Sequence, residues 1–275
     1  MGRLVYSLIV TMLAMGSLSL EQRAPREECA PCVEVPCDSR VAHISAEEMP
    51  RLAATDPIAF VEQCLARYDR DVHSYRCQLT KQERVRGKLG QREQIQACFR
   101  EKPFSVRLEW AKGHGLARRT LYVAGAYENR IQVIPAGWRA LAGLVTCPVD
   151  DEEARANSRY PITQFGLRCG TARTLAAWKR GRASGDLTVA FLGTRSLPDH
   201  PGRPCWVLER IERPGNDPEG IICSRFYFDV ETWLQVGSEL EDARGETVGR
   251  YYFSSVEINP EFTPPTFTLE GLRTR

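Results

Sequence analysis

Few side chains in this sequence have the spacing that catalysis or metal binding requires. The four histidines, His43, His73, His114 and His200, have no partner at the spacing of a zinc-binding helix, and no His-Glu-x-x-His motif occurs. The sequence also contains no Gly-x-Ser-x-Gly turn and no phosphate-binding glycine loop. The acidic run at residues 150–153 does not match a calcium loop and is typical of a helix start. We therefore expect no metal or cofactor and no enzyme, although a hydrolase with an unrecognised site remains an alternative.

The ten cysteines are the other reactive groups, and their number favours an oxidising compartment. Cys29 and Cys32 form a C-x-x-C pair, which is followed by Cys37. A redox pair of this kind normally opens a helix in a βαβ unit, and no such unit follows here. Metal binding would need a fourth ligand, and His43 is the nearby candidate. A structural disulfide or a disordered tail is the favoured interpretation.

Three disulfides are candidates among the remaining cysteines. Cys205 with Cys223 fits a hairpin around residues 214–216, and Cys147 with Cys169 would clamp a helical insertion. A two-residue turn at Gly87-Lys88 would place Cys77 opposite Cys98. That register, however, sets the apolar residues of the two strands on opposite faces, and a slip of one residue restores a common face while separating the cysteines. The third pairing therefore conflicts with the hydrophobic pattern unless a bulge intervenes.

The first twenty residues have the order of a signal peptide: Arg3, an apolar run, then Gly16, Ser17 and Ser19. Whether this segment is cleaved or retained as an anchor is open. Residues 21–50 form a Cys- and Pro-rich linker or tail, and residues 51–275 are expected to form one domain. The net charge of +2 gives no reason to expect nucleic-acid binding. We expect an exported, periplasmic or otherwise extracytoplasmic protein.

The periodicity predicts one early helix followed by strands. Asp56 and Pro57 suit the start of a helix over 56–70. Residues 104–110 alternate between apolar and polar as in a half-buried strand. Further strands are predicted at residues 74–86, 91–99, 119–124 and 130–134. Two helices at 150–156 and 171–180 follow, and then strands at 187–194, 203–212, 222–229, 233–241 and 247–258.

These elements define an α+β fold: a curved antiparallel sheet that covers the N-terminal helix and the mid-chain helical insertion. Several strands are apolar on both faces, as in Tyr251-Tyr252-Phe253. A sheet of this kind must be covered on both sides. Helices can cover one face, and the other could be a filled core or a ligand cavity.

Several short motifs occur in a characteristic order. They are Lys81-Gln82-Glu83-Arg84-Val85, Pro103-Phe104-Ser105-Val106 with Trp110, Leu121-Tyr122-Val123, Ser158-Arg159-Tyr160-Pro161-Ile162-Thr163 with Gly166, Tyr227-Phe228-Asp229, Tyr251-Tyr252-Phe253 and Asn259. With these motifs, residues 56–268 resemble a bacterial family of exported proteins of unknown function. That family is similar in fold to the LolA-like periplasmic lipoprotein carriers.

The resemblance implies an incomplete β-barrel wrapped around helices, with an apolar cavity that could hold acyl chains. The candidate ligand-binding residues are Phe104, Val106, Leu108, Trp110, Leu121, Val123, Arg159 and Tyr160. The apolar strand face is equally consistent with plain core. Arg159 could tie the insertion to the sheet or contact an anionic ligand. Glu83 and Arg84 could hold a polar head group, but an ion pair on the outer face is the favoured interpretation.

The leading functional hypothesis is a non-enzymatic protein that binds a lipid or a lipoprotein acyl chain. Each buried methylene would contribute about 0.8 kcal/mol, so strong binding would need few polar contacts. The alternative is a structural or interaction protein of the cell envelope with a filled core and no ligand. Peripheral contact with membrane components and the oligomeric state are both left open.

Overall fold

Two consecutive helices open the described part of the chain. The computed structural model describes residues 44–112, 116–152, 158–215, 217 and 220–274. Helix α1 spans Met49–Thr55 and α2 spans Pro57–Asp71. The Asp56 carboxylate caps α2 by accepting a hydrogen bond from the backbone N–H of Ala59 at 3.2 Å, as its position before Pro57 predicts. The predicted signal peptide, most of the predicted tail with Cys29, Cys32, Cys37 and His43, and most of the predicted helix at 150–156 lie outside the described residues.

The rest of the described chain is dominated by one antiparallel sheet. Its first half comprises β1 (Ser74–Val85), β2 (Lys88–Leu89), β3 (Glu93–Arg100), β4 (Ser105–Lys112), β5 (Ala117–Val123), β6 (Ile131–Pro135) and β7 (Val145–Cys147). Its second half comprises β8 (Thr188–Leu197), β9 (His200–Ile211), β10 (Ile221–Asp229), β11 (Gln235–Asp242) and β12 (Thr247–Ile258). Short 3-10 helices lie at η1 (Tyr127–Asn129), η2 (Gly137–Ala142), η3 (Ile162–Gln164) and η4 (Pro264–Phe267).

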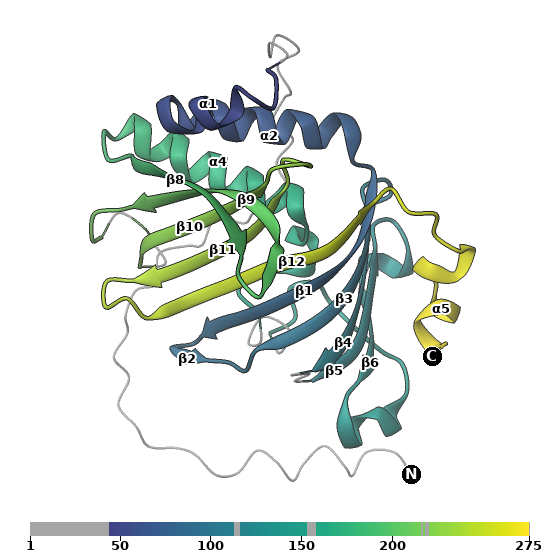
Figure 1. Ribbon diagram of the computed structural model, residues 1–275. Helices are drawn as coiled ribbons and strands as arrows, with labels where there is room; N and C mark the ends of the chain where they lie inside the picture. Colours follow the sequence, from purple (N-terminus) through teal and green to yellow (C-terminus); the bar gives the residue numbers. More distant parts are fainter. Residues whose placement is uncertain (1–43, 113–115, 153–157, 216, 218–219, 275) are drawn as a thin grey trace, which may run out of the picture. The chain divides into compact units, whose positions relative to one another are not determined.

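The strand order shows two meanders joined by one long-range pairing. The order is β7-β6-β5-β4-β3-β1-β12-β11-β10-β9-β8, so every neighbouring pair follows closely in the chain except β1 and β12. Strands β7 and β8 are the two edges, and the sheet bends strongly between its halves (Figure 1). The predicted fold class, a curved antiparallel sheet with an N-terminal helix and a mid-chain helical insertion, is confirmed.

The inner face of the sheet, defined as the face that carries Leu79, Lys81 and Glu83, packs against the helices. Helix α4 (Leu167–Ala183) is the predicted mid-chain helix and contacts α2. Its first residue, Leu167, joins the inner core of β1, β3 and β4, and its Trp178 ring packs against Phe226 of β10 at 5.7 Å. Figure 1 shows α1, α2 and α4 beside the β8–β11 half of the sheet.

The opposite, outer face is covered at the β4–β6 end by the C-terminus. Residues of η4 and of α5 (Leu269–Arg273) pack against Leu121 and Val123 of β5. Arg119 of β5 extends this contact, because its Nη1 donates to the backbone oxygen of Thr274 at 2.8 Å. The proline-containing tail therefore serves as a lid on the sheet rather than as another strand.

Candidate functional site

Five polar or aromatic side chains form a half-enclosed network on the inner face, called here the inner network. Its members are Lys81, Glu83, Glu93, Trp110 and Tyr251. Lys81 Nζ lies 3.0 Å from Glu83 Oε2 and 3.8 Å from a Glu93 oxygen. Tyr251 donates its hydroxyl to Glu83 at 2.8 Å, and Trp110 donates its indole N–H to Glu93 at 2.6 Å. The network thus joins four strands through charged hydrogen bonds.

Strand geometry explains why these five residues meet. Lys81 and Glu83 are two residues apart in β1, so their side chains share a face. Lys81 stands opposite Glu93 of β3 and opposite Tyr251 of β12, and residues that are paired across a ladder share a face as well. Trp110 enters from β4, whose Cα partner in β3 is Ile95.

Burial and neighbouring charge set the protonation of the network. Burial acts to lower the pKa of the Lys81 ammonium, but Glu83 and Glu93 outweigh it and raise the pKa above its ordinary value. Burial, together with Glu83, raises the pKa of Tyr251 well above its ordinary value. Lys81 is therefore a cation and Tyr251 a neutral hydrogen-bond donor at physiological pH.

The Ser-Arg-Tyr-Pro motif lies beside this network. The Tyr160 ring is 6.3 Å from the Tyr251 ring, and the Arg173 guanidinium of α4 stacks over Tyr160 at 4.1 Å. Arg159 donates from Nη1 to the backbone oxygen of Arg84 at 3.4 Å. Of the two roles considered for Arg159, the tie between insertion and sheet is present, and contact with an anionic ligand stays a prediction.

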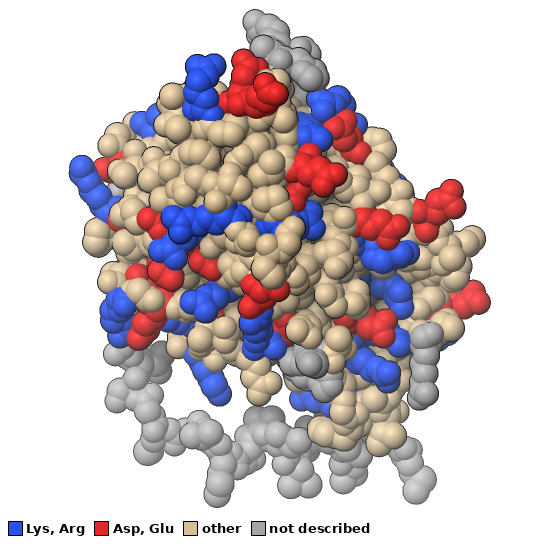
Figure 2. All heavy atoms as spheres, in the orientation of Figure 1, with Lys and Arg blue, Asp and Glu red and all other residues tan. Residues whose placement is uncertain are grey.

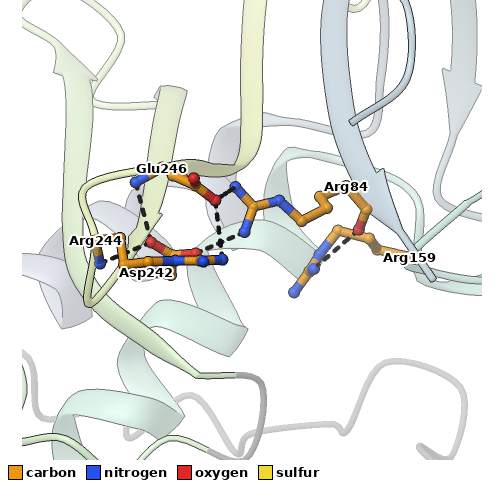
Figure 3. Close-up of polar contacts among 5 residues, drawn as sticks. All are labelled: Arg84, Arg159, Asp242, Arg244 and Glu246. Atoms are coloured by element: carbon orange, nitrogen blue, oxygen red, sulfur yellow. Dashed lines mark hydrogen bonds and ion pairs between the residues drawn. The ribbon is translucent and has the colours of Figure 1, made fainter. Parts of the chain in front are cut away.

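Arg84 belongs to a second cluster, at the turn between β11 and β12. Its guanidinium lies 2.6 Å from Asp242 and 3.1 Å from Glu246, and Arg244 also contacts Glu246 at 3.2 Å (Figure 3). The hydrogen bond from Arg84 lowers the pKa of Asp242 to about 2. Arg159 approaches Arg84 from the other side in Figure 3. This cluster clamps the end of β1 to the β11–β12 turn.

The prediction that Glu83 and Arg84 form an ion pair on the outer face is wrong. Glu83 is buried on the inner face with Lys81 and Tyr251, whereas Arg84 pairs with Asp242 and Glu246. Adjacent residues in a strand point to opposite faces, so these two side chains cannot meet.

The predicted apolar wall divides between the two faces. Val106 and Leu108 are buried in the inner core, and Phe104 and Trp110 pack half-buried against it. Leu121 and Val123 instead belong to the cluster under the C-terminal lid, because Leu121 is paired with Arg107 rather than with an inner residue. The central residues of β5 are buried on both faces, so periodicity could not assign them to one side.

Sequence reasoning did not select Lys81, Glu93 and Tyr251 as site residues. The period-two spacing of Lys81 and Glu83 was a usable signal, because it places both charges on one face. Glu93 and Tyr251 could be added only from the pairing of β3 and β12 with β1.

The three predicted disulfides do not form. Cys77 and Cys98 are free thiols on opposite faces, because Cys77 is opposite Ala97 and Cys98 is opposite Arg76. The apolar face of the hairpin decided the register. Cys205 and Cys223 are also free thiols: Cys205 is opposite Asp229 and Cys223 opposite Ile211, six ladder positions apart.

The predicted pairing of Cys147 with Cys169 is not formed either, because Cys169 is disulfide-bonded and Cys147 is not. Cys147 lies in the edge strand β7, whereas Cys169 is a buried residue of α4. Burial raises the pKa of the Cys205 thiol to about 12, so this group is protonated at physiological pH and is not a nucleophile.

Two hollows lie outside the apolar core. One, of about 400 Å³, is on the outer face between β1, β10, β11 and β12, and charged residues such as Arg225, Glu239 and Arg250 line it. The other, of about 390 Å³, lies between β4, β5 and η2, beside Trp110 and Arg118. Among the described residues, no group of acidic, histidine and cysteine side chains is arranged to hold a metal ion, and no helix is long and apolar enough to cross a membrane.

The chain belongs to a family described as a protein of unknown function (DUF1571), whose model matches residues 72–270. No curated protein sequence matches the chain.

Solved structures with a similar arrangement include MucB, at 16% identity and a TM-score of 0.48, over 78% of this chain and 63% of that chain. The Mycobacterium tuberculosis lipoprotein LppX has 12% identity and a TM-score of 0.42, over 76% of this chain and 99% of its own. A LolA superfamily protein from Nitrosomonas europaea has 9% identity and a TM-score of 0.33, over 77% and 99%. The chain thus spans 63% of the MucB chain's length, and similarity at this level carries no argument about ligand or partner.

Proposed function

We propose that this protein binds an amphiphilic molecule, a lipid or an acylated chain, against the inner face of its sheet. The observation that supports this is a group of half-buried apolar side chains at the margin of the inner core. They are Phe104, Trp110, Ile162, Phe165, Tyr251 and Phe253. Apolar surface left partly uncovered beside polar groups is typical of a ligand site.

The inner network supplies the polar end of such a site. Trp110 and Tyr251 belong both to the apolar margin and to the network, so apolar and charged groups adjoin there. Lys81, whose side chain is 12% exposed, is the cation of this site, and an anionic or hydroxyl-bearing head group would bind to its ammonium. The export predicted from residues 1–20 would place this binding outside the cytoplasm.

A fluorescent fatty-acid assay tests the proposal. The purified protein is titrated with a dansylated fatty acid, and native mass spectrometry of protein from its own compartment looks for a co-purified lipid. Ile162→Ser, which removes half-buried apolar surface, should weaken binding about tenfold, equivalent to about 1.4 kcal/mol. The matched control is Leu89→Ser, because Leu89 is an exposed residue of β2 on another part of the sheet.

The expected result is saturable binding that Ile162→Ser weakens and Leu89→Ser leaves unchanged, with both variants folded by circular dichroism. Wild-type protein that binds no probe and carries no lipid would contradict the proposal.

A second candidate function is an interaction protein with a filled core. It is favoured by the packing of Phe99, Val106 and Leu108, which are buried among protein side chains, and by the position of both hollows outside that core. This alternative predicts a ligand-free mass and no response to the fatty acid, so the same assay separates the two functions.

A further inference from the structure

The 3-10 helix η2 carries the most exposed large apolar side chains of the described chain. Trp138 is 81% exposed and Leu141 is 93% exposed, whereas the other exposed large apolar residues, Leu89, Val145 and Ile211, are between 40% and 43%. The two residues are three positions apart in one 3-10 helix, so their side chains lie on the same side and form one exposed apolar patch, which is a mark of an interaction site.

The backbone holds these two side chains out from the sheet. Gly137 and Gly143 bracket the turn with φ values of 58° and 69°, a region that L-residues with a side chain rarely adopt. The turn connects β6 to the short edge strand β7. In Figure 1 it is the teal helical turn beyond the end of β6, away from α1 and α2.

The charge around the turn is of one sign. Residues 131–147 contain no Asp or Glu, and their charged group at the tip is Arg139, whose guanidinium lies 5.8 Å from the Trp138 ring centre. The exposed Arg118 of β5 lies behind the turn, where it lines the hollow with Ala136 and Ala140. Figure 2 shows tan and blue atoms at the lower end of the molecule, with the red carboxylates higher up.

We propose that η2 inserts Trp138 and Leu141 into the interfacial layer of a bilayer that contains anionic phospholipids. Tryptophan prefers the level of the head groups, and an arginine beside it can keep its guanidinium among the phosphates. The absence of carboxylates in residues 131–147 removes the repulsion that an anionic surface would otherwise meet.

The size of the patch favours a bilayer over a protein partner. A stable protein interface takes roughly 800 Å² from each partner, which two projecting side chains do not supply. A membrane surface needs no complementary groove, because the side chains enter a fluid layer. The same argument disfavours a second copy of this chain as the occupant.

Vesicle flotation tests the proposal with phosphatidylcholine alone and with phosphatidylcholine mixed with phosphatidylglycerol. The wild-type protein should float with the mixed vesicles, and the double variant Trp138→Ala/Leu141→Ala should lose about tenfold or more in partition coefficient. The control Leu89→Ala/Ile211→Ala removes two other exposed apolar residues and should bind as the wild type does. Arg139→Gln should lower the preference for phosphatidylglycerol.

Tryptophan emission provides a second measurement. Trp178, Trp206 and Trp233 are buried and Trp110 is half-buried, so a blue shift on adding vesicles reports mainly on Trp138. Equal flotation of wild type and double variant, or no flotation of either, would overturn the proposal. Self-association that the double variant abolishes would also overturn it, because η2 would then be a contact between copies. Fatty-acid binding should be the same in the double variant as in the wild type. Vesicle binding by η2 and fatty-acid binding at the inner face are therefore tested independently.

Discussion

Glu83 and Arg84 show how one position in a strand changes the role of a charge. Glu83 faces inward and is held by Lys81 and Tyr251, while Arg84 faces outward and clamps a turn through Asp242. Both belong to one short motif, yet they serve separate clusters. In a motif that lies in a strand, residues two positions apart share a face and can act together, whereas adjacent residues cannot.

Removing the cation of the inner network should be costly. Lys81→Ala leaves the carboxylates of Glu83 and Glu93 without their cation, and such buried charges destabilise a protein by about 3 kcal/mol. The measurement is the free energy of unfolding in urea. The control is Lys179→Ala, which breaks an exposed ion pair with Glu62 and should cost less than about 1 kcal/mol.

The double variant Lys81→Ala/Glu83→Gln should recover part of the loss, because it removes one unpaired charge. Equal effects of Lys81→Ala and Lys179→Ala would contradict a stabilising role for the buried network.

At the scale of elements, the start of α4 depends on one glycine. Gly166 precedes the helix with φ at 122°, and a Cβ there would lie 3.1 Å from the Tyr75 hydroxyl and 3.3 Å from the Phe99 ring. The Tyr75 hydroxyl also accepts a hydrogen bond from the backbone N–H of Leu167 at 3.1 Å. The end of the Ser-Arg-Tyr-Pro motif is thus fixed to the inner core by a contact that only glycine permits.

Two glycine substitutions should change stability in opposite directions. Gly166→Ala should destabilise by about 1–3 kcal/mol, because the side chain is strained at this φ and crowds Tyr75. Gly170→Ala, inside α4 with its nearest neighbour at 3.9 Å, should stabilise by about 0.5–1 kcal/mol. Thermal and urea unfolding of both variants provide the comparison, and a neutral Gly166→Ala would show that the contact is not required.

At the scale of the whole molecule, the C-terminus completes a core that the sheet leaves open. Leu272 is fully buried against the outer face of β5, and Phe267 lies beneath the Arg100 guanidinium at 4.7 Å. On the other face of the same strand, the Tyr122 ring lies 6.1 Å from the Phe104 ring, so β5 packs on both sides. The outer cluster exists only because residues 264–273 fold back onto the strand.

A matched pair of leucine substitutions tests this role. Leu272→Ala should lower the free energy of unfolding by about 2–4 kcal/mol, because it empties a buried position. Leu141→Ala should change it by less than about 0.5 kcal/mol, because that side chain is almost fully exposed. Chemical denaturation measures both, and a small effect of Leu272→Ala would show that the C-terminal lid is dispensable.

Local features of the sequence predicted most of the elements. The Asp56-Pro57 start, the alternation in β4 and the helix around Trp178 all follow from capping and period. These signals depend on residues within a few positions of one another, so they can be recognised in the sequence without the tertiary structure. The hydrophobic pattern of residues 74–99 also predicted the observed strand register, in which Cys77 and Cys98 are not paired.

Contacts between distant segments were decided only by the tertiary structure. The pairing of β1 with β12 brings Tyr251 to Glu83 across 168 positions, and the C-terminal lid covers Leu121. Local periodicity does not show which strand pairs with β1 or which segment covers Leu121, because a strand that is apolar on both faces can pack against many neighbours. The sequence alone determined which residues alternate and where the chain turns. The assembled sheet determined which of those faces meet, and so where the charges of the inner network come together.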